Sequence, residues 1–179
     1  MINGVSGLRP TYGRVSRYGA MSLSRSMDKL GAICRGVEDC AMVLSAIHGA
    51  DDRDPTAARN TPFIWEPNTP LASLRIGYDA LAFEEMAKSK NTKKRDIYHA
   101  ALQSLRGLAG SLTPVHLPSS SAYSGLAGLT IAVEAAMNFN ELVESGHIRE
   151  LVQQDAGSWP NTFRRGSLVP GSDYLRAQQ

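Results

Sequence analysis

The sequence has few cysteines and none of the long apolar runs that a membrane span requires. Cys34 and Cys40 are six positions apart in a segment that we predict to be helical, where they would point to different faces. We therefore expect no disulfide and a reducing, cytoplasmic location. No apolar run approaches the roughly 18 to 20 residues of a spanning helix, and no secretory signal opens the chain. These absences predict a soluble protein with no membrane partner.

Several motifs that define cofactor, metal or nucleophile sites are also absent. No G-x-G-x-x-G follows the strand expected at 74–78, so the sequence predicts no dinucleotide cofactor. The acidic run at 51–54 lacks the glycine and the closing glutamate of a calcium loop, so we predict no metal. No serine stands in a G-x-S-x-G turn. The histidines lie apart from one another and from the cysteines, and we assign no metal or catalytic role to His48, His99, His116 or His147.

A cluster of serines, PSSSAYSG at 118–125, lies between a predicted strand and a predicted helix. A nucleophile could be presented there in principle. We favour the simpler interpretation that Ser119–Ser121 and Ser124 connect and cap the following helix. From composition and spacing alone, the sequence contains no catalytic set.

What the sequence does have is an uneven distribution of charge. The net charge of the chain is +2, but residues 1–36 carry six lysines and arginines against one acidic residue, Asp28. A basic segment is one sign of a nucleic-acid partner. Tyr12 and Tyr18 are its aromatic residues, however, and no RNA- or DNA-binding motif surrounds them. We therefore disfavour nucleic-acid binding against a solvated or internally paired arginine face.

Hydrophobic spacing predicts an α/β fold with a mixed, mostly parallel sheet and surrounding helices. A strand, an amphipathic helix and a second strand follow one another in the proportions of a βαβ unit, whose strands lie parallel in one sheet. Glycines and prolines punctuate the opening, so only short regular structure is expected there. The predicted helices are 37–47, 97–108, 125–143 and one opening at Ser172 or Asp173, and the predicted strands are 74–78 and 112–117.

These elements divide one partial domain into four parts. We expect an opening segment with its helix at 1–56, a surface loop at 57–70, the βαβ unit at 71–118 and a helical C-terminal part at 119–179.

The opening part carries the ordered motifs GLRPTYGRVS, SMDKLG, RGVEDCA and DDRDPT, between residues 4 and 56. Together they resemble the segment that follows the nucleophile in the amidase signature family, which includes the A subunits of the glutamyl- and aspartyl-tRNA amidotransferases. Segments 71–79, 94–117 and 155–179 are also similar to family sequence, the last to its amidase-like branch. The resemblance implies a partial amidase-signature fold that lacks the N-terminal core strands.

The resemblance also implies hydrolysis of a carboxamide, or transfer of its ammonia, by a serine nucleophile with a second serine and a lysine. In the family these residues precede the segment matched from Gly7 onward. Lys29 falls within SMDKLG, and the other lysines, at 88, 90, 93 and 94, lie in or beside a polar linker. The resemblance therefore implies a C-terminal amidase fragment that is inactive alone. The alternatives are a non-catalytic module that complements a separate upstream catalytic chain, and a basic nucleic-acid-binding protein.

The resemblance places the basic opening segment against the family's catalytic core. We interpret Arg14 and Asp28 as active-site scaffolding, because a buried arginine needs a charged partner. The alternative is a surface pair of negligible energy. The stretch LAGLTIAVE, ending at Glu134, lacks the tyrosines expected in glutamine-using relatives, which favours a general amidase acting on a small amide. We also expect exposed apolar patches on the helices 37–47 and 125–143, and hence self-association.

Overall fold

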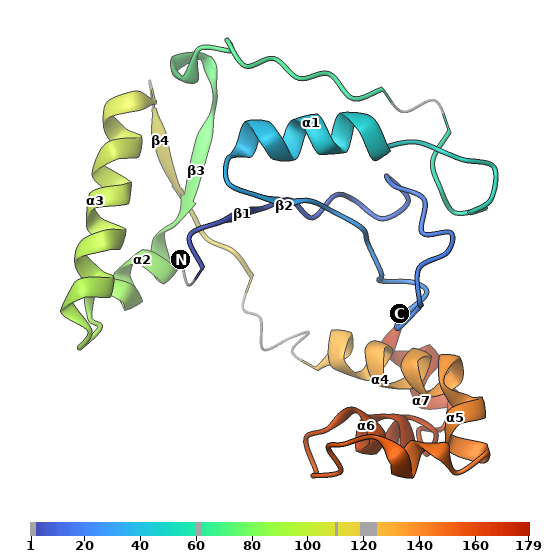
Figure 1. The fold of residues 1–179 in the computed structure, drawn as a ribbon. Helices are drawn as coiled ribbons and strands as arrows, with labels where there is room; N and C mark the ends of the chain where they lie inside the picture. The colour runs from blue at the N-terminus through green and yellow to red at the C-terminus, as the bar shows by residue number, and fades with distance from the viewer. Residues whose placement is uncertain (1–2, 60–61, 110, 119–124) are drawn as a thin grey trace. The chain divides into compact units, whose positions relative to one another are not determined.

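The computed structural model describes residues 3–59, 62–109, 111–118 and 125–179. The serine cluster, Ser119–Ser121 and Ser124, therefore lies outside the described residues. The chain forms two compact units, one of Met1–Trp65 with Tyr123–Gln179 and one of Glu66–Ala122, and each is described by itself (Figure 1). Within the described ranges, every helix is too short or too polar to span a lipid bilayer.

The helix α1 (Val37–Ile47) of the first unit has the predicted bounds. It packs on an antiparallel ladder of β1 (Ser6–Gly7) and β2 (Ile33–Cys34) through Cys40, Ala41 and Leu44 (Figure 1). The amide of Gly36 donates to Asp39 Oδ2 at 3.2 Å and closes the first turn. The prediction that Cys34 is helical is wrong, because the extended backbone of Gly36 begins the helix after it. Both cysteines are free thiols.

Among the described residues, the C-terminal part of the first unit contains the α-helices α4 (Leu126–Asn138), α5 (Asn140–Glu144), α6 (Trp159–Gly166) and α7 (Gly171–Ala177), and a 3-10 helix, η3 (His147–Glu150). A small apolar core of Ala135, Ile148 and Phe163 lies among them. The prediction of one helix over 125–143 is wrong at Phe139, whose φ of −107° and ψ of 20° separate α4 from α5. Its ring stacks on Phe163 with centroids 4.7 Å apart. This packing accounts for a break that helical spacing alone does not reveal.

The last helix also begins differently from the prediction. Ser172 or Asp173 was expected to cap it, but α7 begins at Gly171 and follows Pro170. The carbonyl of Pro170 accepts the amide of Asp173 at 2.9 Å. The helix α6 is not among the predicted helices. It is only eight residues long and opens with Trp159 and Pro160, so helical spacing gives too weak a signal to predict it.

The second unit is the predicted βαβ crossover (Figure 1). Its strands β3 (Ile76–Asp79) and β4 (Leu112–Val115) are parallel, with Ile76 opposite Leu112. The crossover contains the predicted helix as α3 (Thr92–Leu108), which begins at Thr92 within the expected polar linker and not at 97, because Asn91 caps it by accepting the amide of Lys94. It also contains an additional helix, α2 (Ala80–Ala87). Asp79 caps α2 by accepting the amide of Ala82 at 3.2 Å. The α/β class and the parallel crossover are thus confirmed, and the strands form two separate two-stranded ladders among the described residues.

The close approach of α4 and α6 depends on Gly166. A Cβ at this position would collide with the carbonyl of Ala132 and lie 2.9 Å from the Cβ of Ala136. We expect Gly166→Ala to lower the free energy of unfolding by about 3 kcal/mol, because the backbones would have to separate. Chemical denaturation followed by circular dichroism measures this loss.

The matched control is Gly171→Ala at the start of α7, where an added Cβ meets nothing within 4 Å. It should leave stability unchanged or raise it by up to about 1 kcal/mol. Equal midpoints for the two variants would contradict the packing of α4 on α6.

Candidate functional site: a polar scaffold in the first unit

The carboxylate of Glu134 joins three segments of the first unit. Glu134 lies on α4 with 8% of its surface exposed. Its Oε2 accepts the hydroxyl of Ser24 at 2.6 Å and the amide of Ser26 at 3.0 Å. Its Oε1 accepts the hydroxyl of Ser26 at 2.6 Å and that of Tyr174, on α7, at 2.9 Å. One side chain thus holds the loop at 22–28 and the last helix against α4.

Burial and hydrogen bonding act on the pKa of Glu134 in opposite directions. Burial alone raises the pKa of the carboxyl, but the hydrogen bonds from Ser24, Ser26 and Tyr174 outweigh burial, and the pKa lies below its ordinary value. The pKa of Tyr174 is raised, because its hydroxyl donates to the Glu134 carboxylate. Glu134 is therefore ionised at neutral pH and its oxygens are occupied, which makes it a structural acceptor and a poor general base.

Asn138, one turn further along α4, extends the same contact. Its side-chain amide donates to the carbonyl of Leu23 at 3.1 Å, and its Oδ1 accepts Nε of Arg25 at 2.9 Å. The loop is thereby fixed by backbone as well as side-chain groups.

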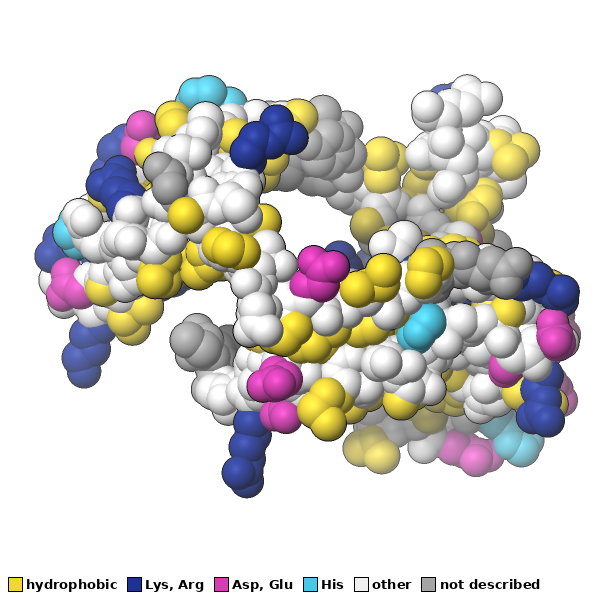
Figure 2. Space-filling view, turned by 90° about the horizontal axis from the view of Figure 1, so that it is seen from above, with side chains coloured by type: hydrophobic (Ala, Val, Ile, Leu, Met, Phe, Trp, Pro, Cys, Tyr) yellow, Lys and Arg dark blue, Asp and Glu magenta, His cyan; other side chains and the backbone are white. Residues whose placement is uncertain are grey.

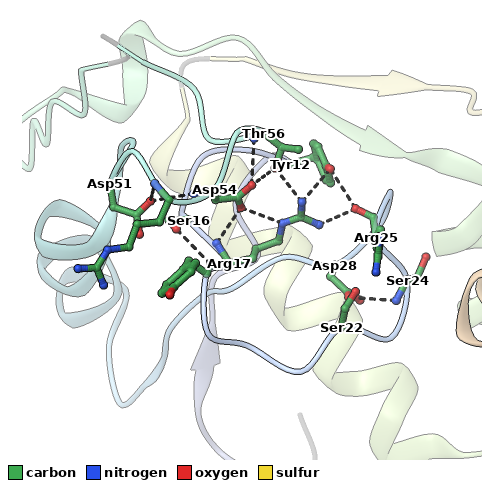
Figure 3. Close-up of polar contacts among 12 residues, drawn as sticks. Tyr12, Ser16, Arg17, Ser22, Ser24, Arg25, Asp28, Asp51, Asp54 and Thr56 are labelled. Atoms are coloured by element: carbon green, nitrogen blue, oxygen red, sulfur yellow. Dashed lines mark hydrogen bonds and ion pairs between the residues drawn. The ribbon is translucent and has the colours of Figure 1, made fainter. Parts of the chain in front are cut away.

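Asp28 closes this loop from within (Figure 3). Its Oδ2 accepts the amides of Leu23 at 2.9 Å and Ser24 at 3.0 Å, and the hydroxyl of Ser22 at 3.1 Å. These bonds set the turn that carries Ser24 and Ser26 to Glu134. Among the described residues Asp28 takes part in no ion pair.

Arg17 is the centre of a second polar cluster (Figure 3). Its backbone amide and its Nε donate to Asp54 Oδ2 at 2.9 and 3.3 Å. One terminal nitrogen donates to the carbonyl of Arg25 at 2.5 Å, and the other to Tyr12 at 2.9 Å and Thr56 at 2.7 Å. The guanidinium also lies 4.6 Å from the centre of the Tyr12 ring. Segments 12–17 and 54–56 are therefore bound together by charge and hydrogen bonding.

Asp54 is ionised because its neighbours stabilise the carboxylate. The hydroxyl of Thr56 donates to Oδ1 at 2.6 Å and is the main cause, followed by the backbone amides of Arg17 and Thr56, and the pKa lies far below its usual range. Only 9% of the Asp54 surface is exposed. The carboxylate thus anchors the long loop after α1 to the opening segment.

The two residues predicted as scaffolding, Arg14 and Asp28, are not brought together. Arg14 donates to the carbonyl of Pro62 at 2.6 Å, whereas Asp28 closes its own loop. Their role beside an active site stays a prediction. The arginine that does meet a buried carboxylate is Arg17, which sequence reasoning missed. Its position directly after the G-R-V-S motif could have marked it as a candidate. The sequence does not reveal, however, which arginine contacts Asp54.

No serine in this scaffold is paired with a lysine among the described residues. The hydroxyls of Ser22, Ser24 and Ser26 donate to carboxylates. The ammonium group of Lys29 donates to the carbonyl of Met27 at 2.7 Å. The described part of the chain also contains no group of three or more histidine, cysteine, aspartate or glutamate side chains placed to hold a metal ion.

Comparison with known proteins identifies the family. The family model described as Amidase matches residues 1–168. A curated relative, the A subunit of the glutamyl-tRNA(Gln) amidotransferase of Burkholderia mallei, is 34% identical over 158 residues, which cover 80% of this chain and 31% of that protein. The chain therefore belongs to the amidase signature family, and it spans about a third of the length of the curated relatives it matches.

Solved structures agree with this assignment. A protein described as a vestigial complex that reveals the origins of an s-triazine catabolic enzyme has a TM-score of 0.73 and 28% identity, over 98% of this chain and 36% of its own. The native peptide amidase of Stenotrophomonas maltophilia has a TM-score of 0.69 and 25% identity, over 99% of this chain and 40% of its own. The resemblance and the partial amidase fold are thus confirmed.

The Glu134 contacts make stability depend on pH. The pKa of Glu134 in the folded state lies below its unfolded value, near 4.3. Its contribution is therefore complete above that value and is lost as the pH falls through the lower pKa of the folded state. We expect Glu134→Gln to lower the free energy of unfolding at pH 7 by about 2–4 kcal/mol and to reduce the acid dependence. Urea denaturation between pH 3 and pH 7, roughly spanning the titration range of carboxyl groups, measures both effects.

Glu85→Gln, an exposed change of the same charge on α2, is the control. It should alter the free energy of unfolding by less than about 0.5 kcal/mol across the same pH range. A Glu134→Gln variant that matched it would contradict the structural role of the carboxylate.

Proposed function

We propose that these residues form part of an amidase that hydrolyses the C–N bond of small carboxamides, and that they frame its active site without supplying the reacting groups. Two observations support this. The chain matches the family over residues 1–168 but spans 31% of a curated relative. The serine hydroxyls of its polar scaffold donate to carboxylates that already accept other protein hydrogen bonds, and not to a lysine.

Amide hydrolysis by a serine requires a base for the hydroxyl proton and N–H donors for the oxyanion. Asp54 and Glu134 do not suit the first role, because their pKa values are lowered and their oxygens are already bound. We propose that the nucleophilic serine, the second serine and the lysine come from other parts of the enzyme. The segment 12–28 then acts by position, with Asp28 fixing the loop and Arg14 fixing the chain at Pro62.

A small amide is the substrate class that this proposal assigns. The relatives include proteins named as a glutamyl-tRNA(Gln) amidotransferase component and as a peptide amidase. The stretch before Glu134 lacks the tyrosines expected in glutamine-using relatives, which favours a general amidase. We propose a cytoplasmic location on the same family grounds.

Ammonia release from simple amides such as acetamide and benzamide tests whether the chain is catalytic alone. We expect no ammonia above a control without protein, because no serine of the polar scaffold is paired with a lysine among the described residues. Activity that is lost on changing Ser22 to alanine, or Ser119–Ser121 and Ser124 together, would overturn the proposal and identify the nucleophile.

A second candidate is a non-catalytic module that complements a separate catalytic chain. Apolar side chains on α1 favour it, since Val37 and Met42 are each 66% exposed. Met137, on α4, is also exposed, and Figure 2 shows apolar side chains reaching the surface on one face of the chain. Mixing the chain with a polypeptide that carries the family's serine- and glycine-rich signature distinguishes the two. Ammonia release by the mixture, and by neither part alone, would favour the complementing module.

A further inference from the structure

A cavity of about 840 Å³ opens between the loops at 12–30 and 53–56 of the first unit. Tyr12 and Tyr18 line it, together with the aliphatic side chains of Met21 and Leu30. A volume of this size is in the range of about 300–1,000 Å³ that is usual for small-molecule sites. The cavity is therefore large enough for an organic ligand.

Basic side chains outnumber acidic ones in its walls. Arg17, Arg25, Lys29 and Arg53 line the cavity together with the two carboxylates of Asp28 and Asp54. Both carboxylates already accept protein hydrogen bonds. The wall therefore carries an excess of positive charge that its own acids do not balance.

Three of the four basic side chains have no carboxylate partner among the described residues. Lys29 donates once, to the carbonyl of Met27, and its ammonium group can make about two further hydrogen bonds. Arg25 donates its Nε to Asn138, which is neutral. The guanidinium of Arg53 lies 5.2 Å from the centre of the Tyr18 ring. These are donors held in place by aromatic and backbone groups but still available to a ligand.

We propose that this cavity binds the oxyanion of a small molecule, a carboxylate or a phosphate group, through Lys29 and Arg53. A guanidinium and an ammonium group are the usual partners of such oxyanions. Met21 and Leu30 supply apolar wall for the organic part of the ligand, since the cavity is far larger than a bare anion. The cavity adjoins the segment 12–28 that we propose to frame the active site, but anion binding there requires no amide turnover and is tested without it.

A small anion fits these observations better than a nucleic acid. The three basic side chains without a carboxylate partner among the described residues line one cavity, whereas a nucleic-acid surface spreads its basic groups along a face that follows the phosphate backbone. The aromatic rings also carry cations on their faces: Arg17 lies over Tyr12 and Arg53 over Tyr18. Those ring faces are therefore occupied and do not offer a stacking platform for bases.

Titration of the full chain with inorganic phosphate, and separately with acetate, tests the proposal. We follow the backbone amide resonances by two-dimensional NMR. Phosphate or acetate should shift the amides of Tyr18, Lys29 and Arg53 along one saturable curve. The double variant Lys29→Met, Arg53→Gln should weaken this binding at least about tenfold, because it removes both charged hydrogen-bond donors of the site. The stronger of the two ligands identifies the oxyanion.

Lys90→Met with Arg106→Gln is the matched control, because it removes the same charge from exposed positions of the second unit. It should bind both anions as the unchanged chain does. Lys29→Arg, which keeps the charge, should retain binding within about threefold. The proposal is overturned if the amide shifts do not saturate with either anion, or if both double variants weaken anion binding equally. It is also overturned if a single-stranded oligonucleotide binds saturably while phosphate and acetate do not bind.

Discussion

The buried carboxylate of Glu134 is the interaction on which the first unit depends. Ser24 and Ser26 are more than 100 positions away from it in sequence, yet both donate to its oxygens, and Tyr174 donates from the last helix. Burial of an ion costs free energy unless hydrogen bonds satisfy it. Here two hydroxyls, a phenol and an amide do so, and the loop at 22–28 therefore has one position relative to α4.

A second constraint explains how an opening segment with little apolar surface is ordered. Residues 7–21 contain glycines, arginines and a proline but no hydrophobic period. Order comes instead from Arg17, which donates to Asp54, Thr56 and Tyr12 at once. In such a segment hydrogen bonding to charged groups replaces apolar burial as the source of specificity.

Local pattern predicted much of the fold and little of the polar scaffold. The helix 37–47 and the parallel crossover follow from apolar spacing and appear as expected. The break at Phe139 and the start of α7 at Gly171 follow from tertiary packing and from a preceding proline, which periodicity does not record. The contacts of the polar scaffold could not be predicted from the sequence for the same reason. Several arginines stand in the opening segment, and only the folded chain shows that Arg17 meets Asp54.

Hydrogen exchange at the amide of Ser26 tests the central role of Glu134 most directly. This amide lies in a loop, outside any helix or strand, and its acceptor is Glu134 Oε2 at 3.0 Å. If the carboxylate fixes the loop, the Ser26 amide will exchange as slowly as the amides of Ala135 and Ala136 in α4. Exchange at the rate of an unprotected loop, while α4 remains protected, would contradict the account.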